Sequence, residues 1–466
     1  MAPPTRPLFD SLPLHPDHPI GSAWGLYGPD DELGTLNLLT ADVVRAAAAS
    51  EIQRGETVPL NLPLTLPLLP MNPARKPCEH RFLAKGYAND DEITINTQGS
   101  SHWDGLRHYP YQNLAPDAPR FYNGATQADL DGDGARSSHR IGIHALARRG
   151  IAGRGVLLDW AAWVASQPDR GPYDPFSAHA IPLAELQAVA RAQAVTFRPG
   201  DILLVRSGWL AAYQALSDED KIALARRPHR TFVGVDGSRE MMAWHWAQGF
   251  AAVAGDTNAY EAWPPARRAP DWPVSCHEVF LSGWGMPIGE LWDLEALADR
   301  CRALSRWSFF LTSSALNLPG GVASPANAMA FGTKGCRLKP CFKLLVKFPA
   351  DIEADMVTAH ASLSSADAPF TAVRSPGHNG EYSEYSEYSG PSVAPLLRAA
   401  TATTSRLRRI NRRGEREFEL EFWSLAVNRA GTYCVRFDVY YYCKLNLVAF
   451  YGVRFSYNFP VADMKW

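Results

Sequence analysis

The sequence predicts an α/β domain, because short apolar runs alternate with segments that have the pattern of helices. The apolar runs have the length of buried strands and lie at residues 156–159, 202–206, 251–256 and 309–312. One helical segment falls in each interval between them, at residues 183–192, 239–248 and 294–304. Strands that alternate with helices in this order favour a sheet with at least some parallel pairing.

Capping residues mark the ends of these three predicted helices. Pro182 opens the first, and Ser238 and Gly249 begin and end the second. Asp293 is the expected N-cap of the third. These signals predict where each helix lies as well as that it exists.

A further helix is predicted near the N-terminus, after Thr40, whose hydroxyl is a suitable N-cap. Gly55 is expected to end this helix. Its apolar residues fall on one helical face, and they are Val43, Val44, Ala47, Ala48 and Ile52. Residues 55–69 then alternate prolines and leucines, which suits an edge strand or an extended connection.

Composition excludes several classes of protein. The chain has 466 residues, of which 46% are hydrophobic and 20% charged, as in soluble globular proteins. The net charge is -2 and the basic residues of the first 330 positions are dispersed, so we expect no nucleic-acid partner. No apolar run reaches the roughly 18–20 residues of a membrane span, and the N-terminus lacks a secretory signal. Seven cysteines without a C-x-x-C pair predict a cytoplasmic protein with free thiols.

The composition changes after Gly335. Four of the seven cysteines, a Glu-Tyr-Ser repeat at 381–389 and a basic run at 406–416 all follow this point. Without a sustained helical or strand period, such a segment is expected to be irregular or disordered. We therefore predict a domain at 1–335 and a tail of uncertain order at 336–466. The alternative is a small β-rich appendage from Tyr433 to Phe459.

The richest stretch for chemistry is residues 98–108, which follow the alternating run 92–96. In an extended segment, His102 and Asp104 are two residues apart and share a face. They can therefore reach one cation together. Taken alone, this pattern suits a surface His and Asp around a turn at Gly105 equally well.

A second cluster far along the chain favours the metal site. His277 alone would be a satisfied core histidine, and Glu290 alone a carboxylate at a helix start. Converging with His102 and Asp104, they would form the mixed nitrogen and oxygen set that zinc or manganese accepts. We predict one site for a divalent metal, zinc or manganese, made of these four residues.

Several segments, in this order, resemble the cyclase family that includes bacterial kynurenine formamidase and isatin hydrolase. They are Trp24-Gly25 with residues 30–37, Gly150-Ile151-Ala152-Gly153-Arg154-Gly155-Val156, Gly200–Trp209 and Pro319-Gly320-Gly321-Val322-Ala323-Ser324-Pro325. The resemblance covers about residues 24–331. It implies a swivelling β/β/α domain that is often a homodimer.

The family's metal motif reads His-x-Gly-Thr-His-x-Asp-x-Pro-x-His. His102, Asp104 and His108 match its second His, its Asp and its last His, and Gln98 replaces the first His. The resemblance implies that His108 is the general base. It also implies that the missing first His leaves a second metal in doubt, with Gln98 as a weak ligand through its carbonyl oxygen.

The resemblance implies a hydrolase acting on C–N bonds other than peptide bonds, of the arylformamidase kind. A metal-bound water would open an aryl formamide or cyclic amide, with N-formylkynurenine of tryptophan catabolism as the nearest named small-molecule substrate. The alternatives are a lactone or cyclic-imide hydrolase of secondary metabolism, and a catalytically weak binding or scaffold protein. Aromatic residues near the motifs are expected to wall the substrate pocket, namely Trp103, Phe121, Tyr122 and Trp284.

Overall fold

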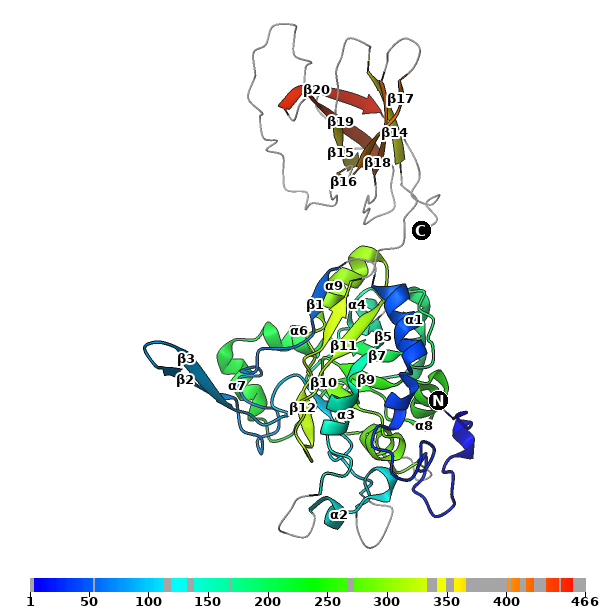
Figure 1. The fold of residues 1–466 in the computed structure, drawn as a ribbon, viewed down its shortest axis with the longest axis vertical. Coiled ribbons are helices and arrows are strands. Elements are labelled where there is room, and N and C mark those ends of the chain that lie inside the picture. Colours follow the sequence, from blue (N-terminus) through cyan, green and yellow to red (C-terminus); the bar gives the residue numbers. More distant parts are fainter. Residues whose placement is uncertain are drawn as a thin grey trace. The chain divides into compact units, whose positions relative to one another are not determined.

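The structure is a computed structural model that describes two parts of the chain (Figure 1). The first part is residues 4–332, except 53–54, 113–118, 132–137, 168–169 and 266–271. The second comprises only the strands between residues 342 and 455. By its contacts the chain divides into two units, Met1–Cys336 and Arg337–Trp466.

A nine-stranded mixed sheet forms the centre of the first unit. Its strands, in order across the sheet, are β1 (Thr57–Pro59), β13 (Met329–Phe331), β11 (Ser308–Ser313), β5 (Ile151–Asp159), β7 (Ile202–Arg206), β9 (Ala252–Gly255), β10 (Ile288–Glu290), β4 (His102–Asp104) and β12 (Ala323–Pro325). Strands β5, β7, β9 and β10 are parallel, and the other pairings are antiparallel. The predicted α/β class with partly parallel pairing is confirmed, and β1 is an edge strand as expected.

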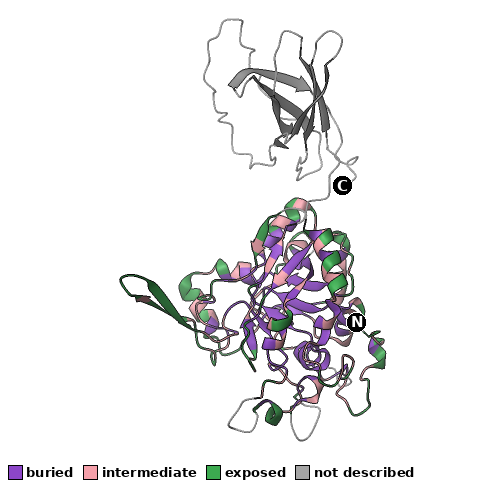
Figure 2. Ribbon diagram, viewed as in Figure 1, coloured by how far each residue is buried: buried purple, intermediate pink, exposed green. Residues whose placement is uncertain are grey.

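Both faces of this sheet are buried, as the apolar run of β7 shows. Leu203 and Val205 point into one hydrophobic core, and the alternating Ile202 and Leu204 point into another. Such continuous apolar strands are typical of sheets covered on both faces. Figure 2 shows the buried strands between more exposed helices.

The helices divide between these two cores. Those that contribute to the first core are η1 (Phe9–Ser11), η3 (Tyr122–Gly124), α2 (Gln127–Asp131), α4 (Trp160–Ala165), α5 (Leu183–Ala192), α6 (Trp209–Gln214), α7 (Asp218–Ala225), α8 (Arg239–Gln248) and η4 (Glu278–Trp284). Those against the second are η2 (Gly34–Leu38), α1 (Ala41–Glu51), α3 (His144–Arg149) and α9 (Glu295–Leu304). A short parallel pair, β6 (Ala180–Ile181) and β8 (Gly234–Val235), lies outside the main sheet.

The predicted caps hold for two helices, and the third begins one residue late. Helices α5 and α8 have the predicted bounds. The Ser238 hydroxyl accepts a hydrogen bond from the backbone N–H of Met241. Helix α9 begins at Glu295 rather than Leu294, and the Asp293 carboxylate accepts from the backbone N–H of Glu295 at 3.2 Å.

Helix α1 begins after Thr40 as predicted, and its buried face differs from the prediction at its C-terminal end. It ends at Glu51, and Ile52, expected on the buried face, is exposed. Glu51 is buried instead, because its carboxylate pairs with Arg154 and Arg306. The apolar pattern could not reveal a buried charge whose partners lie more than 100 residues away.

Strands β2 (Glu79–Ala84) and β3 (Asn89–Thr94) form a separate two-stranded hairpin. The hairpin projects from the body of the first unit (Figure 1), and almost all of it is exposed (Figure 2). Only a few residues separate its second strand from β4.

In the second unit the structure describes strands only. One sheet holds β14 (Phe342–Phe348), β18 (Arg416–Phe422) and β17 (Thr404–Ile410), and another holds β16 (Ala400–Thr401), β15 (Met356–Ser365), β19 (Tyr433–Cys443) and β20 (Asn446–Phe455). Strands β19 and β20 fall within the range of the alternative β-rich appendage, Tyr433 to Phe459. The other five strands were expected neither in that appendage nor in an irregular tail. The Glu-Tyr-Ser repeat lies outside the described residues. Among the helices that the structure describes, none is long and apolar enough to cross a membrane.

Candidate metal centre

Strand β4 carries the two central residues of the site. It pairs with β10 on one side and β12 on the other. His102 and Asp104 are two residues apart and share one face, and Glu290 lies directly opposite His102 in the β10 register. All three side chains are almost completely buried. The sheet therefore brings an imidazole and two carboxylates to one place.

A first group of metal-binding atoms is formed by His102, Asp104 and Glu290. The Nε2 atom of His102 lies 3.3 Å from Asp104 Oδ1 and 3.4 Å from Glu290 Oε2. Its Nδ1 atom lies 2.7 Å from the carbonyl oxygen of Ser100, which fixes the proton on Nδ1 and leaves a lone pair on Nε2.

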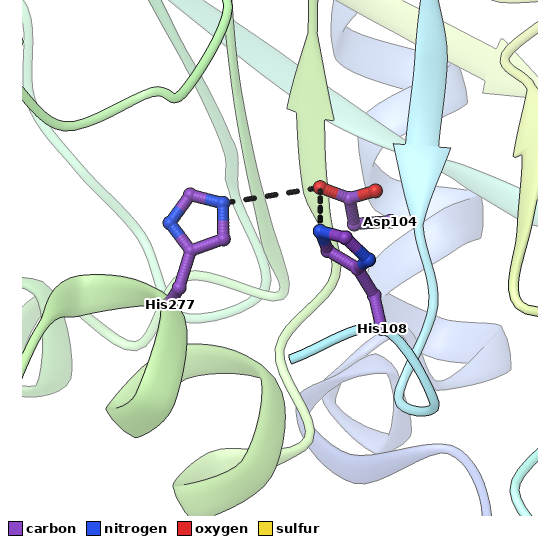
Figure 3. A group of neighbouring side chains, drawn as sticks. All are labelled: Asp104, His108 and His277. Carbon is purple, nitrogen blue, oxygen red and sulfur yellow. Dashed lines mark ion pairs between the residues drawn. The ribbon is translucent and has the colours of Figure 1, made fainter. Parts of the chain in front are cut away.

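A second group shares Asp104 and adds two histidines, His108 and His277 (Figure 3). His277 lies immediately before η4, and His108 follows the turn after β4. The Nε2 atoms of His277 and His108 lie 3.9 and 3.8 Å from Asp104 Oδ2. His277 Nε2 also lies 3.1 Å from Glu290 Oε1, so Glu290 links the two groups.

Glu261 orients His277 and is absent from the sequence-based site. Its carboxylate accepts hydrogen bonds from His277 Nδ1 at 2.8 Å and from the backbone N–H groups of Cys276 and His277. The tautomer with a proton on Nδ1 presents the Nε2 lone pair to the site. No local pattern marks Glu261, because only the fold brings it to a histidine sixteen residues later.

The electrostatics of the site are those of a buried cluster of opposite charges. Burial alone would lower the pKa values of the two innermost histidines, but neighbouring carboxylates outweigh it and raise the pKa of His102 to about 9 and of His277 to about 10. Burial and Asp104 would raise the pKa of Glu290, but the adjacent imidazoles of His102 and His277 lower it to about 2. Against the effect of burial, the histidines also hold the pKa of Asp104 well below its usual range.

Buried atoms without a partner test whether the site fits a cation. His102 Nε2 and Asp104 Oδ2 are buried and have no hydrogen-bond partner among the described residues. Buried polar atoms are usually hydrogen-bonded, and these two lie together among residues that can bind a metal. Two imidazole nitrogens and two carboxylates are also the donors that zinc and manganese accept. The residues present therefore fit a divalent cation.

Comparison with known proteins identifies the family of the chain. The model of the family described as Putative cyclase matches residues 18–262. The chain belongs to this cyclase family. The resemblance stated from the sequence is thereby confirmed.

A crystal structure of a novel cyclase is 30% identical and has a TM-score of 0.56, covering 66% of this chain and 99% of that one. The expected cyclase-type fold is therefore also confirmed. An isatin hydrolase bound to the product analogue thioisatinate is 13% identical, with 59% and 91% of the two chains covered and a TM-score of 0.41. A predicted metal-dependent hydrolase from Bacillus stearothermophilus is 15% identical, with 59% and 97% covered and a TM-score of 0.34. No curated protein matches the chain.

Gln98 of this cyclase-family chain is turned differently from the expected ligand. Its side-chain nitrogen, rather than its carbonyl oxygen, faces the site and donates to Asp104 Oδ1 at 2.6 Å. The same nitrogen lies 3.0 Å from His108 Nδ1. In this orientation Gln98 is a hydrogen-bond donor between Asp104 and His108, and its role as a weak metal ligand stays a prediction.

The four aromatic residues expected to wall the pocket lie in the cores instead. Strand alternation points Trp103 away from His102 and Asp104, and its ring packs against Trp292. The other three belong to the first core, namely Phe121, Tyr122 and Trp284. All four are buried in the described structure, and their expected role in substrate binding stays a prediction.

Two other aromatic rings lie beside the metal-binding residues. The centroids of Tyr109 and Trp263 are 5.4 and 6.4 Å from that of His277. Both side chains are half-buried, whereas the four expected residues are fully enclosed. Tyr109 directly follows His108, so its position next to the motif could have identified it in the sequence. No sequence signal could have identified Trp263, because it comes from the loop after Glu261.

Proposed function

We propose that the protein is a metal-dependent hydrolase that opens the amide of an aryl formamide or a cyclic amide. The observation that carries this proposal is the buried convergence of two histidines and two carboxylates, in which His102 Nε2 and Asp104 Oδ2 lack any other partner among the described residues. Membership of the cyclase family supports it. N-formylkynurenine is the proposed substrate, which would place the enzyme in tryptophan catabolism.

His102, Asp104, His277 and Glu290 would hold the cation, either zinc or manganese. When bound, the cation supplies a Lewis acid for the carbonyl and lowers the pKa of water at the site. Before it binds, the raised pKa values of His102 and His277 mean that protons occupy the same lone pairs. Cation binding therefore competes with protons and should tighten as the pH rises.

His108 is the proposed general base. Burial lowers its pKa, which keeps the imidazole neutral and able to accept a proton at neutral pH. Its side chain is also the most exposed of the metal-binding set, at 20%, so it lies where water and substrate would enter. It would take the proton of the attacking water as the new C–O bond forms. It would then return that proton to the nitrogen that leaves as the C–N bond breaks.

The half-buried rings of Tyr109 and Trp263 support an aromatic substrate. Each presents a ring beside His277, at the margin of the charged cluster. An aryl group packed there would bring an adjacent carbonyl towards the metal-binding residues. The described free cysteines Cys78, Cys276 and Cys301 suit a reducing compartment, and we propose a cytoplasmic location.

The second candidate is a catalytically weak binding relative, favoured by Gln98. A histidine at position 98 would add a metal ligand. The side-chain nitrogen of Gln98 instead donates a hydrogen bond to Asp104 Oδ1 and so competes with a cation for that oxygen. The two candidates differ in turnover and agree in fold, so only an activity assay separates them.

The test uses the full chain stripped by chelation and reloaded with zinc or manganese separately. Each form is assayed with N-formylkynurenine, isatin and a simple lactone. We expect metal-dependent turnover of the formamide, about one metal per chain, and loss of both in Asp104→Asn. Metal uptake without turnover of any substrate would favour the binding protein. Equal metal content in the Asp104→Asn variant would overturn the site.

A further inference from the structure

Arg75 is a half-buried arginine that lies beside the metal centre and forms no ion pair with any described acid. It belongs to the segment that leads into β2. Its Nη1 atom donates a hydrogen bond to the backbone carbonyl of Gln98 at 3.0 Å. The side-chain nitrogen of Gln98 in turn lies 3.0 Å from His108 Nδ1. Gln98 therefore links the guanidinium of Arg75 to the proposed base.

A turn at Asn72 fixes the backbone from which this side chain extends. The carbonyl of Asn72 accepts a hydrogen bond from the backbone N–H of Arg75 at 3.0 Å. The side-chain oxygen of Asn72 accepts another from the backbone N–H of Ala74 at 3.1 Å. Asparagine is favoured in such turns because its side chain bonds to the backbone two residues on. Arg75 is thus held at its backbone by the turn and at its side chain by Gln98.

Most of the hydrogen-bonding capacity of Arg75 is unused by the described residues. Arg107 donates to three backbone carbonyls, and Arg206 donates with all three of its side-chain nitrogens to two carboxylates. Among the described residues Arg75 has only its bond to Gln98, so Nε and Nη2 have no partner there. A guanidinium is a planar fork of N–H donors that matches both oxygens of a carboxylate. The free edge of Arg75 is therefore suited to an anion.

The charge of Arg75 acts on the metal centre. Burial has the largest effect on the pKa of His108 and lowers it, and the nearby charges of His277 and Arg75 lower it as well. A positive charge that acts on this imidazole can also act on a substrate bound against it. The two donors without a partner are therefore close to the place where the proposed reaction occurs.

We infer that Arg75 binds a carboxylate of the substrate, so that the enzyme acts on aryl amides that carry this group. This inference rests on the proposed function, because it assigns a substrate class to the same site. N-formylkynurenine carries a carboxylate, whereas isatin and a simple lactone do not. Two parallel N–H···O bonds would fix the orientation of the substrate as well as hold it. Since Arg75 is half-buried, salt would screen this pair less than a pair on the open surface.

The residues assigned to different parts of the substrate are all neighbours of His108, which Figure 3 shows beside Asp104. The ring centroid of His108 lies 6.0 Å from that of Tyr109, whose ring is proposed to pack against the aryl group. Its Nε2 atom lies 3.8 Å from Asp104 Oδ2, and Gln98 links it to Arg75. A substrate with its amide at His108 can therefore direct its ring towards Tyr109 and its carboxylate towards Arg75.

The first test measures binding and requires no turnover. The probes are 2-aminobenzoate and 2-aminobenzamide, two fluorescent aryl compounds of similar size that differ in charge. Each is titrated into the zinc-loaded full chain and into its Arg75→Gln variant. We expect the variant to raise the Kd of 2-aminobenzoate by about tenfold or more, the effect of losing a hydrogen bond between charged groups. The Kd of 2-aminobenzamide should change by less than about twofold, because it has no charge to lose.

The matched control is Lys76→Gln, which removes the same charge from the next residue, whose side chain is exposed. It should leave both Kd values unchanged. Arg75→Lys keeps the charge without the planar fork and should recover only part of the affinity for 2-aminobenzoate. Equal losses for the two probes would show that Arg75 only braces Gln98, and equal losses in Lys76→Gln would show a general effect of charge. Either result, or a wild-type chain that does not bind 2-aminobenzoate, would overturn the inference.

The second test uses the corresponding formamides, 2-formamidobenzoate and 2-formamidobenzamide, as substrates. The wild-type enzyme should prefer the carboxylate in kcat/KM by about tenfold or more, and Arg75→Gln should remove this preference chiefly by raising KM. Equal turnover of both compounds by the wild type would refute carboxylate recognition and leave the proposed hydrolysis standing. No turnover of either, together with binding that depends on Arg75, would refute the hydrolysis and support the carboxylate site. Unchanged circular dichroism in each variant confirms that the chain has folded.

Discussion

The carboxylate of Glu261 fixes the tautomer and the orientation of the metal-binding histidine His277. Glu261 holds Nδ1 and two backbone N–H groups of the same segment, so both the ring and its backbone are fixed. We predict that Glu261→Gln lowers the metal affinity by about 10–100-fold, because the neutral amide fixes the tautomer less strongly. Titration against a chelator of known affinity measures this. The control is Glu240→Gln, an exposed acid in the first turn of α8, which should not change the affinity.

His108 belongs to a metal-binding group and is also the proposed base, and one variant separates the two roles. As a base, His108→Ala should lower the catalytic rate by roughly 10²–10⁴ with the metal still bound. Metal content and single-substrate kinetics on the same preparation measure both quantities. A variant that has lost its metal would make His108 a ligand, and an unchanged rate would remove it from the mechanism.

His245 provides a pH dependence that is separate from the metal centre. It is fully buried, bonded to the Met241 carbonyl and to Tyr260 Oη, and burial lowers its pKa to about 4. An unfolded chain with an ordinary histidine pKa near 6.5 takes up a proton first as the pH falls. The stabilisation is therefore present above about pH 6.5 and is lost as the pH falls towards 4.

From pH 7 to pH 5 this loss amounts to about 2 kcal/mol of unfolding free energy. Urea unfolding followed by tryptophan fluorescence at the two pH values measures it. In His245→Phe the difference between the two pH values should shrink by that amount. An equal pH difference in the wild type and the variant would contradict the prediction.

At the scale of elements, Gly289 allows β10 to lie close to its neighbours. A Cβ atom there would lie 2.6 Å from the Cβ of Ala254 in β9 and 2.7 Å from Nε1 of Trp292. Gly289→Ala should therefore cost about 1–3 kcal/mol of unfolding free energy and displace the adjacent Glu290. Unfolding and metal titrations should show both losses. Gly171→Ala, in open space, is the control, and equal behaviour of the two would refute the packing argument.

The elements that sequence could predict are those specified by local signals. Helix α8 has its N-cap and its terminating glycine within twelve residues, so both ends followed from neighbours in the chain. Strand β10 has three residues and no such signal, and Glu290 was expected before a helix rather than in a strand. Its place depends on pairing with β4, nearly 190 residues earlier, which local sequence cannot reveal.

The residues of the candidate site could likewise be predicted where local sequence specifies them, and not where the fold brings distant residues together. His102 and Asp104 share a face because of strand alternation, and the same alternation turns Trp103 into the core. The sequence suggested all three as site residues because it placed them side by side. Glu261 and Trp263 were missed because the fold, rather than the motif, brings them to His277.

At the scale of the whole molecule, the main sheet and both cores of the first unit are made only of residues that precede the second unit. Strand β13 is the last described element of the first unit, and it pairs with β1 and β11. All nine strands of the main sheet, both cores and every metal-binding residue lie before residue 333. None of these described contacts needs a residue of the second unit.

A chain ending at Gly335 should therefore fold and keep the properties of the metal centre. We expect its melting temperature to stay within about 2–4 °C of that of the full chain, the shift that about 1 kcal/mol gives in a domain of 150–250 residues. Metal content and turnover should also persist, because every metal-binding residue lies before residue 333. Thermal unfolding, metal analysis and an activity assay on both chains measure these properties. An insoluble or metal-free truncated chain would show that residues after 335 complete the fold.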